Sequence, residues 1–150
     1  MRILVDGDAC PVINECEKLA SDFDCELIIY TDLAHQIKSK IGQVIVTDTA
    51  TQSVDMLVYN NAKKNDIIIT QDYGLAALVL GKKTYVINHF GNFYNDENID
   101  YLLMLRHHNS KIRRAGKKHP GFNKRTDEDN KAFYNTMFSL LKKHINRKED

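Results

Sequence analysis

Residues 66–70 (DIIIT) contain an uninterrupted run of β-branched side chains, three isoleucines followed by a threonine. Such a run is typical of a strand that is buried on both faces, and strands of this kind belong to parallel sheets covered by helices. Similar apolar runs recur along the chain, and we expect four further strands at 2–6, 25–30, 43–47 and 83–88. The sequence therefore predicts an α/β fold around a mainly parallel five-stranded sheet flanked by helices.

Segments with helical periodicity separate and follow these strands. The first is 11–21, in which Pro11 suits the first turn and Asp8 is a candidate cap. We expect further helices from Thr51 or Ser53 to about Lys64, at 73–80, at 96–109 and, as a C-terminal closing helix, at 127–145. The segments without a clear helical or strand pattern are 31–40, which fits a short helix or a loop, and the predicted loops 89–95 and 110–126.

The chain has 150 residues, a length that suits a single domain with one core, so we expect residues 1–150 to fold as one unit. No apolar run approaches the roughly 20 residues that span a bilayer. Acids stand where a signal peptide would be apolar. The three cysteines form no C-x-x-C pair, which favours reduced thiols over a zinc site. We therefore expect a cytoplasmic protein with no membrane partner.

Aspartates occur where the predicted strands end. Asp6 ends the first strand, and Asp8 follows two residues later. Asp72 lies two residues beyond the fourth strand, and Asp55 lies near the start of the helix that precedes that strand. Ligands of parallel α/β sheets bind at the carboxyl ends of the strands. If the chain reverses its winding between the first and fourth strands, these four aspartates meet there as candidate catalytic residues, with Asp48 after the third strand a further candidate.

Carboxylates gathered in one place repel each other unless a cation lies among them. Mg²⁺ and Mn²⁺ prefer carboxylate and water oxygens, and such ions activate water and stabilise charge on a phosphate. The cluster therefore indicates phosphodiester hydrolysis. Aspartates after strands also serve as turn formers and helix caps, and for Asp8 or Asp72 taken alone the cap is the favoured interpretation; the four acids together favour the metal site. Cys10 beside the cluster is an alternative candidate as a catalytic thiol, although no base is identifiable next to it.

Four motifs resemble the YaiI/YqxD family of uncharacterised bacterial proteins. In chain order they are VDGDACPV at 5–12, ITQDYGLAALVL at 69–80, NIDYLLMLRH at 98–107 and RRAGKKHPGF at 113–122. The resemblance covers nearly the whole chain and implies a three-layer PIN-like domain. PIN-like nucleases hold Mg²⁺ or Mn²⁺ with acids after the first strand, in a middle helix and after the fourth strand. By position, the resemblance implies Asp6, Asp55 and Asp72 as metal ligands, with Asp8 the second acid of the opening motif.

Positive charge gathers in one segment although the net charge is only +1. Residues 106–125 hold eight lysines and arginines, three histidines and no acid. Such a segment suits the phosphates of a nucleic acid, although a lysine-rich stretch is also a common solvated surface. The candidate nucleic-acid-binding residues are Arg106, Arg113, Arg114, Lys117, Lys118, Lys124 and Arg125.

The predicted loop at 89–95 carries three aromatic residues, Phe90, Phe93 and Tyr94. They are candidates to stack the bases of an unpaired strand, or else to pack against the adjoining helix. His35 and His89 are interpreted as loop residues rather than metal ligands. Taken together, these features favour a divalent-metal-dependent nuclease that acts on RNA, with single-stranded RNA the expected partner. The alternatives are a non-catalytic RNA-binding or regulatory module, and a metal-dependent phosphatase.

Overall fold

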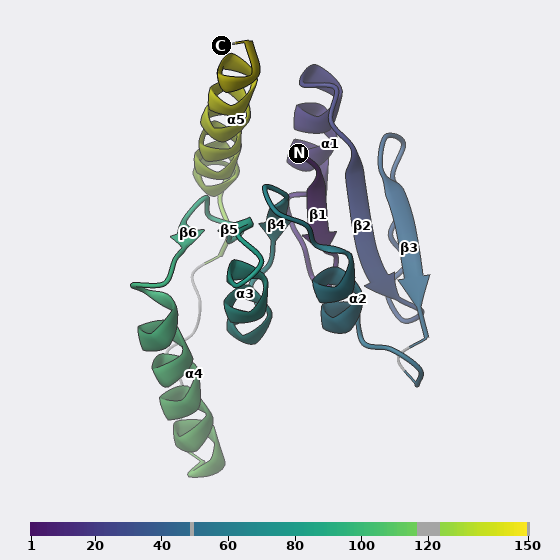
Figure 1. Ribbon diagram of the computed structural model, residues 1–150. Coiled ribbons are helices and arrows are strands. Elements are labelled where there is room, and N and C mark those ends of the chain that lie inside the picture. The colour runs from purple at the N-terminus through teal and green to yellow at the C-terminus, as the bar shows by residue number, and fades with distance from the viewer. Residues whose placement is uncertain (49, 117–123, 150) are drawn as a thin grey trace.

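The computed structural model describes residues 1–48, 50–116 and 124–149 (Figure 1). Its centre is a sheet of six strands in the order β3-β2-β1-β4-β5-β6. The first five strands are parallel, and β6 pairs antiparallel with β5. The strands are β1 (Ile3–Asp6), β2 (Leu27–Asp32), β3 (Gln43–Thr47), β4 (Ile67–Ile69), β5 (Tyr85–Ile87) and β6 (Phe93–Tyr94).

The mainly parallel α/β fold expected from the sequence is confirmed, but the sheet has six strands instead of five. The extra strand β6 lies in 89–95, which the sequence analysis assigned to a loop. The chain turns back after β5 through Gly91, whose φ of +82° is readily adopted only by glycine. The Asn88 N–H then donates to the Asn92 carbonyl oxygen at 2.9 Å, and this closes a hairpin too short to give a strand pattern in the sequence.

In the described residues five helices accompany the sheet: α1 (Ile13–Asp22), α2 (Val54–Asn61), α3 (Tyr73–Leu80), α4 (Ile99–Arg114) and α5 (Asp127–Glu149). Alternate residues along the buried strands point to opposite faces, so each strand contributes to two cores. On one face Val5 and Ile69 pack with apolar residues of α1 and α5. On the other, Leu4 and Ile68 pack with residues of α2, α3 and α4. The result is three layers, helices, sheet and helices.

Two local expectations were wrong, those for the start of the first helix and the end of the fourth, and the open question of residues 31–40 is answered in favour of a loop. The first helix begins after Val12 and no side chain caps it, so Asp8 is not its cap. The segment after β2 forms no helix, because the Asp32 carboxylate accepts the Ala34 and His35 N–H groups and folds it into a turn. Helix α4 continues through 110–114, part of the predicted loop, since the first residue that favours a break is Gly116 with φ +71°.

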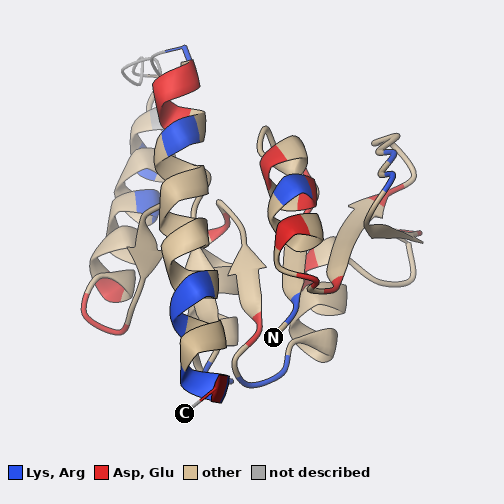
Figure 2. Ribbon diagram, turned by 90° about the horizontal axis from the view of Figure 1, so that it is seen from above, with Lys and Arg blue, Asp and Glu red and all other residues tan. Residues whose placement is uncertain are grey.

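The closing helix fits the helix dipole, as expected. Its first turn is acidic and its last turn basic, and Figure 2 shows this red and blue distribution along α5. Within the described part of the chain, no helix is long and apolar enough to cross a bilayer.

The topology reverses between β1 and β4, as the site prediction requires. Strand β1 lies between β2 and β4, with Val5 paired to Ile29 on one side and to Ile69 on the other. The chain therefore winds outward in two directions from this pair of strands. In α/β sheets the point of reversal opens a crevice at the carboxyl ends of the strands, where ligands bind.

Candidate functional site

A cleft of about 420 Å³ occupies this point of reversal. We call it the acidic cleft, and its lining residues are Asp6, Asp8, Asp32, Ser53, Val54, Asp55, Gln71 and Asp72. All four aspartates proposed from the sequence as catalytic residues therefore face one space, although they come from β1, α2 and the segment before α3. The further candidate Asp48 does not line the cleft, because its carboxylate is exposed and accepts the Ala50 N–H at 3.0 Å.

Asp6 is the buried member of the cluster, with 9% of its surface exposed. One carboxylate oxygen accepts the Thr70 hydroxyl at 2.9 Å, and the other accepts the Asp8 N–H at 3.3 Å. Burial raises the pKa of Asp6 to about 6, the two hydrogen bonds oppose this rise, and the charges of Asp55 and Asp8 add to it. A carboxylate in this position would be stabilised by a nearby cation.

Thr70 connects Asp6 to Asp72. Its fully buried hydroxyl donates to Asp6 and accepts the Asp72 N–H at 3.0 Å, so both acids are positioned by one side chain. Asp72 also caps α3, since its Oδ1 accepts the Leu75 N–H at 3.1 Å. Asp72 therefore caps α3 and lines the acidic cleft at the same time. The sequence analysis missed Thr70. Its position as the polar residue directly after the three isoleucines of β4 is the signal that could have indicated it.

Asp55 reaches the cleft because α2 begins there. The Ser53 hydroxyl accepts the Met56 N–H at 3.3 Å and caps the helix, as one of the two predicted alternatives. Asp55 follows in the first helical turn, where the helix dipole favours a negative charge. Its side chain is exposed to solvent at the mouth of the cleft.

A histidine lies beside two of the acids, which the sequence analysis did not anticipate. His35 Nδ1 lies 2.7 Å from Asp32 Oδ1, and its Nε2 lies 3.2 Å from Asp8 Oδ1. The hydrogen bond to Asp32 raises the pKa of His35, and the same contact lowers the pKa of Asp32. When it is protonated, His35 is a counter-ion for Asp8 and Asp32. Asp32 itself was missed because the second strand was expected to end two residues earlier.

Arg106 brings positive charge to the opposite side of the acidic cleft. It extends from α4 and places Nη1 3.6 Å from Asp72 Oδ1, while 56% of its side chain remains exposed. A guanidinium at this position can meet a phosphate oxygen without leaving the edge of the cleft.

The other basic candidates are dispersed. Arg114 is exposed eight residues farther along α4, about 12 Å along a helix axis that leads away from the sheet (Figure 1). Lys124 is exposed and Arg125 is half-buried before α5. Lys117, Lys118 and the side chain of Arg113 lie outside the described residues.

Burial argues against the functional roles considered for two other candidates, Tyr94 and Cys10. Tyr94 is only 4% exposed and its hydroxyl donates to the Thr70 carbonyl at 3.2 Å, so its suggested base-stacking role is wrong. Cys10 lies near the acids, but burial raises the pKa of its thiol to about 11. It therefore stays protonated at neutral pH and is a poor nucleophile.

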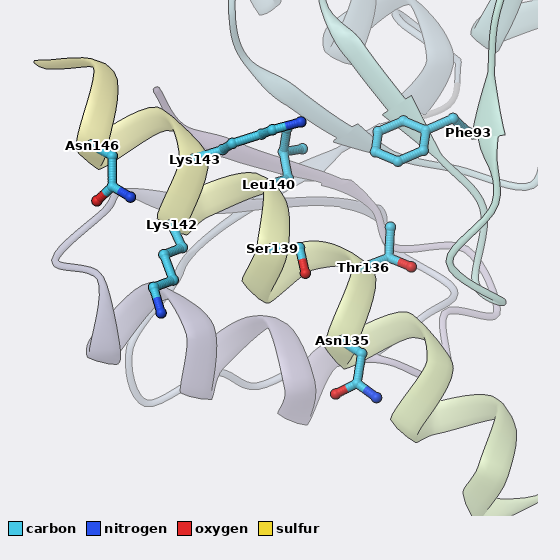
Figure 3. A pocket seen from close by; sticks show the side chains of 8 residues that line it. All are labelled: Phe93, Asn135, Thr136, Ser139, Leu140, Lys142, Lys143 and Asn146. Atoms are coloured by element: carbon cyan, nitrogen blue, oxygen red, sulfur yellow. The ribbon is translucent and has the colours of Figure 1, made fainter.

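A second and larger hollow, of about 700 Å³, lies between β6 and α5 (Figure 3). Figure 3 shows Phe93 across from the lysines and amides of α5. Among the described residues, the lining of this hollow includes no carboxylate, histidine or cysteine side chain and shares no residue with the acidic cleft. The carboxylates therefore make the smaller cleft the candidate site.

The donor set of the acidic cleft suits a hard divalent cation. Most of its side-chain oxygens come from carboxylates, with a hydroxyl from Ser53 and an amide oxygen from Gln71, and Mg²⁺ and Mn²⁺ prefer such oxygens over nitrogen or sulfur. In the described residues, however, no group of three histidine, cysteine or acidic side chains is placed to hold a metal ion. The arrangement thus fits an ion that takes one or two carboxylates directly and keeps several waters, which is usual for Mg²⁺.

The chain is similar to a family described as "Uncharacterized BCR, YaiI/YqxD family", which matches residues 4–143. A UPF0178 protein of Clostridium novyi (strain NT) is 52% identical over 143 residues, which cover 95% of this chain and 96% of the relative. A UPF0178 protein of Clostridium tetani (strain Massachusetts / E88) is 48% identical over 143 residues, with 95% and 98% coverage. No solved structure matches the chain.

Proposed function

The chain belongs to the YaiI/YqxD family, and from its acidic cleft we propose that it is a divalent-metal-dependent nuclease acting on RNA. The observation that carries the proposal is the convergence of carboxylates from β1, α2 and the start of α3 on one space. The buried Asp6, whose pKa is raised to about 6, supports the same conclusion because its ionised form needs a compensating positive charge.

Asp6, Asp55 and Asp72 are the residues that would hold Mg²⁺ or Mn²⁺, one or two of them directly and the remainder through water, as we also propose for Asp8. When bound, such an ion lowers the pKa of a coordinated water and stabilises charge on the phosphate. The Thr70 hydroxyl orients Asp6, and the α3 cap fixes Asp72. Preorganised groups of this kind accelerate a reaction because they need no rearrangement as charge develops.

Phosphate contacts would come from the basic side chains around the cleft. Arg106 at the edge of the cleft is placed to meet the phosphate nearest the acids. The flanking phosphates would be met by the rest of the predicted set, namely Arg113, Arg114, Lys117, Lys118, Lys124 and Arg125. Such contacts position a strand without reading its sequence. We further propose a cytoplasmic location, which the three free cysteines support.

A specific observation favours one alternative, a non-catalytic RNA-binding module. The described residues contain no three-residue metal group, so the acids would then form a scaffold and RNA would bind without turnover. A metal-dependent phosphatase is the remaining alternative. It would hydrolyse a small ester such as p-nitrophenyl phosphate and would not need the basic residues.

The proposal predicts that end-labelled single-stranded RNA is cleaved with Mn²⁺ or Mg²⁺. Chelation with EDTA should stop the reaction, and added Mn²⁺ should restore it, because the acids alone cannot activate water. The measurement is product formation on a denaturing gel, with Arg106→Gln as a variant expected to raise KM and retain metal dependence. Binding without cleavage would favour the non-catalytic module, and hydrolysis of p-nitrophenyl phosphate alone would favour the phosphatase.

A further inference from the structure

The loop of residues 88–92, between β5 and β6, is held rigidly at the carboxyl edge of the sheet. Asn88 Oδ1 accepts the Phe90 N–H at 2.9 Å and the Asn92 N–H at 3.0 Å. Gly91 lies so close to α5 that a Cβ there would be 2.8 Å from the Ala132 carbonyl oxygen. The position of Phe90 is therefore fixed by its own loop and by the helix behind it.

Phe90 presents an aromatic ring that Arg125 covers. The residue is 43% exposed, and the Arg125 Cζ lies 5.1 Å from the ring centroid. Arg125 is itself held, since its Nε donates to Asn130 Oδ1 at 2.7 Å and its Nη2 donates to the His89 carbonyl oxygen at 2.5 Å. A guanidinium has five N–H donors, so these two bonds leave donors for a phosphate oxygen. The pair combines a flat apolar surface with a fixed positive charge.

One hydrogen bond connects this pair to the acidic cleft, and a shared electrostatic effect supports their proximity. The His89 N–H donates to Gln71 Oε1 at 3.3 Å, and Gln71 lines the cleft. The charges of both Asp6 and Arg125 act on the Cys10 thiol, whose pKa is raised by Asp6 and lowered by Arg125 after the larger effect of burial. The ring and guanidinium therefore belong to the neighbourhood of the carboxylates.

We propose that Phe90 and Arg125 form a nucleotide subsite beside the acidic cleft, in which Phe90 stacks an unpaired base and Arg125 binds the adjoining phosphate. The inference rests on the proposed function, and it adds that the substrate is single-stranded next to the cleaved bond. A base in a duplex is already stacked on its neighbours, so its face is closed to a protein side chain. An unpaired base offers that face, and aromatic and arginine side chains bind it with little regard to sequence.

A structural role alone accounts poorly for the exposure of Phe90. Tyr94, the aromatic residue that does pack the core near this loop, is 4% exposed. Phe93 provides a matched control, because it is 41% exposed but lies over the separate hollow on α5 (Figure 3). A generic contribution of exposed aromatic residues to binding would involve Phe93 as much as Phe90.

The test is the affinity of a fluorescein-labelled single-stranded RNA dodecamer, measured by anisotropy in EDTA so that no cleavage occurs. Phe90→Leu should weaken binding roughly tenfold, since it keeps an apolar side chain but removes the stacking surface. Phe90→Tyr should bind like the wild type, and so should Phe93→Leu. Equal affinities of Phe90→Leu and wild type would overturn the subsite, as would equal losses in Phe90→Leu and Phe93→Leu or no binding by the wild type.

A dodecamer whose central nucleotides are abasic separates base stacking on Phe90 from phosphate binding by Arg125. Phe90→Leu should bind this oligomer as the wild type does, whereas Arg125→Gln should weaken binding of both oligomers and reduce the salt dependence by about one phosphate contact. Arg125→Gln with unchanged binding would contradict the phosphate role. Thermal unfolding of each variant shows whether it is folded. If Phe90→Leu is misfolded, wild-type affinity of the folded Phe90→Tyr variant is still required by the stacking role.

Failure of the subsite and failure of the nuclease proposal give different results. Loss of binding in Phe90→Leu without any RNA cleavage by the wild type would retain the subsite and reject the nuclease. Metal-dependent cleavage with Phe90→Leu binding unchanged would reject the subsite alone. A third readout is hydrolysis of bis(p-nitrophenyl) phosphate, which has no base and should proceed equally in wild type and Phe90→Leu.

Discussion

Asp6→Asn is expected to lower RNA hydrolysis by more than about a hundredfold, because the loss even of a group that merely orients a metal ligand costs about 10- to 100-fold. Asp6 is the buried carboxylate of the acidic cleft and has both oxygens directed by hydrogen bonds. Asp72→Asn should cause a loss of similar size. The measurement is the single-turnover rate of cleavage of labelled single-stranded RNA with saturating Mn²⁺.

Asp48→Asn is the matched control for this experiment. Asp48 also follows a strand at the carboxyl edge, but its exposed side chain does not line the cleft. Its substitution should leave the rate within about twofold of the wild type, as expected for a surface charge outside the site. Cleavage by Asp6→Asn and Asp72→Asn at the wild-type rate would reject the catalytic assignment. A loss in Asp48→Asn as large as in Asp6→Asn would show a nonspecific charge effect.

The same Asp6→Asn substitution should stabilise the metal-free protein at neutral pH. The pKa of Asp6 is raised from 3.8 to about 6 in the folded state, chiefly by burial. Between these values the folded state binds more protons than the unfolded state, so its stability falls as the pH rises from 4 through 6. At about 1.4 kcal/mol for each pKa unit, the ionised carboxylate costs about 3 kcal/mol at pH 7.5. The neutral amide avoids this cost but keeps only one of the two acceptor oxygens, so the net gain should be about 2 kcal/mol.

Asp66→Asn should have the opposite effect and provides the contrast. Asp66 lies before β4, at the other edge of the sheet, where it is 3% exposed and accepts Arg2 Nη2 at 2.6 Å. Its substitution leaves the Arg2 charge without its partner and should lower the free energy of unfolding by about 3 kcal/mol. Metal-dependent cleavage by the folded protein should persist.

Urea unfolding in EDTA at pH 7.5 and pH 4 measures both effects. The gain in Asp6→Asn should be present at pH 7.5 and nearly absent at pH 4, where Asp6 is largely protonated in the folded wild type. A destabilised Asp6→Asn at pH 7.5 would show that the ionised carboxylate contributes to the fold, contrary to this account.

Local patterns predicted the layers of the fold, because buried parallel strands and amphipathic helices each leave a periodic signature. The isoleucines of β4 and the capped start of α2 were found in this way, and together they place Asp55 and Asp72 at one edge. The hairpin to β6 was missed because two residues are too few for a pattern. The turn at Asp32 was also missed, since its hydrogen bonds satisfy the backbone without any periodicity.

The candidate site was only partly predictable for a related reason. Strand order brings Asp6 and Asp72 together, but the reversal of winding at β1 and β4 was only a condition of the sequence prediction, because no local pattern indicates it. The contacts of His35 with Asp8 and Asp32, and the link through Thr70, depend on how side chains of distant segments meet. Such contacts have no local signal.

The most direct test of the central claim is a crystal of the protein soaked in Mn²⁺ and measured at a wavelength where manganese scatters anomalously. The account predicts an anomalous peak within the acidic cleft, at coordinating distance from Asp6 and bound also by Asp55 or Asp72, directly or through water. The same soak of Asp6→Asn should lose this peak. Peaks confined to other parts of the surface, with the cleft empty at saturating Mn²⁺, would contradict the assignment of a metal-dependent site.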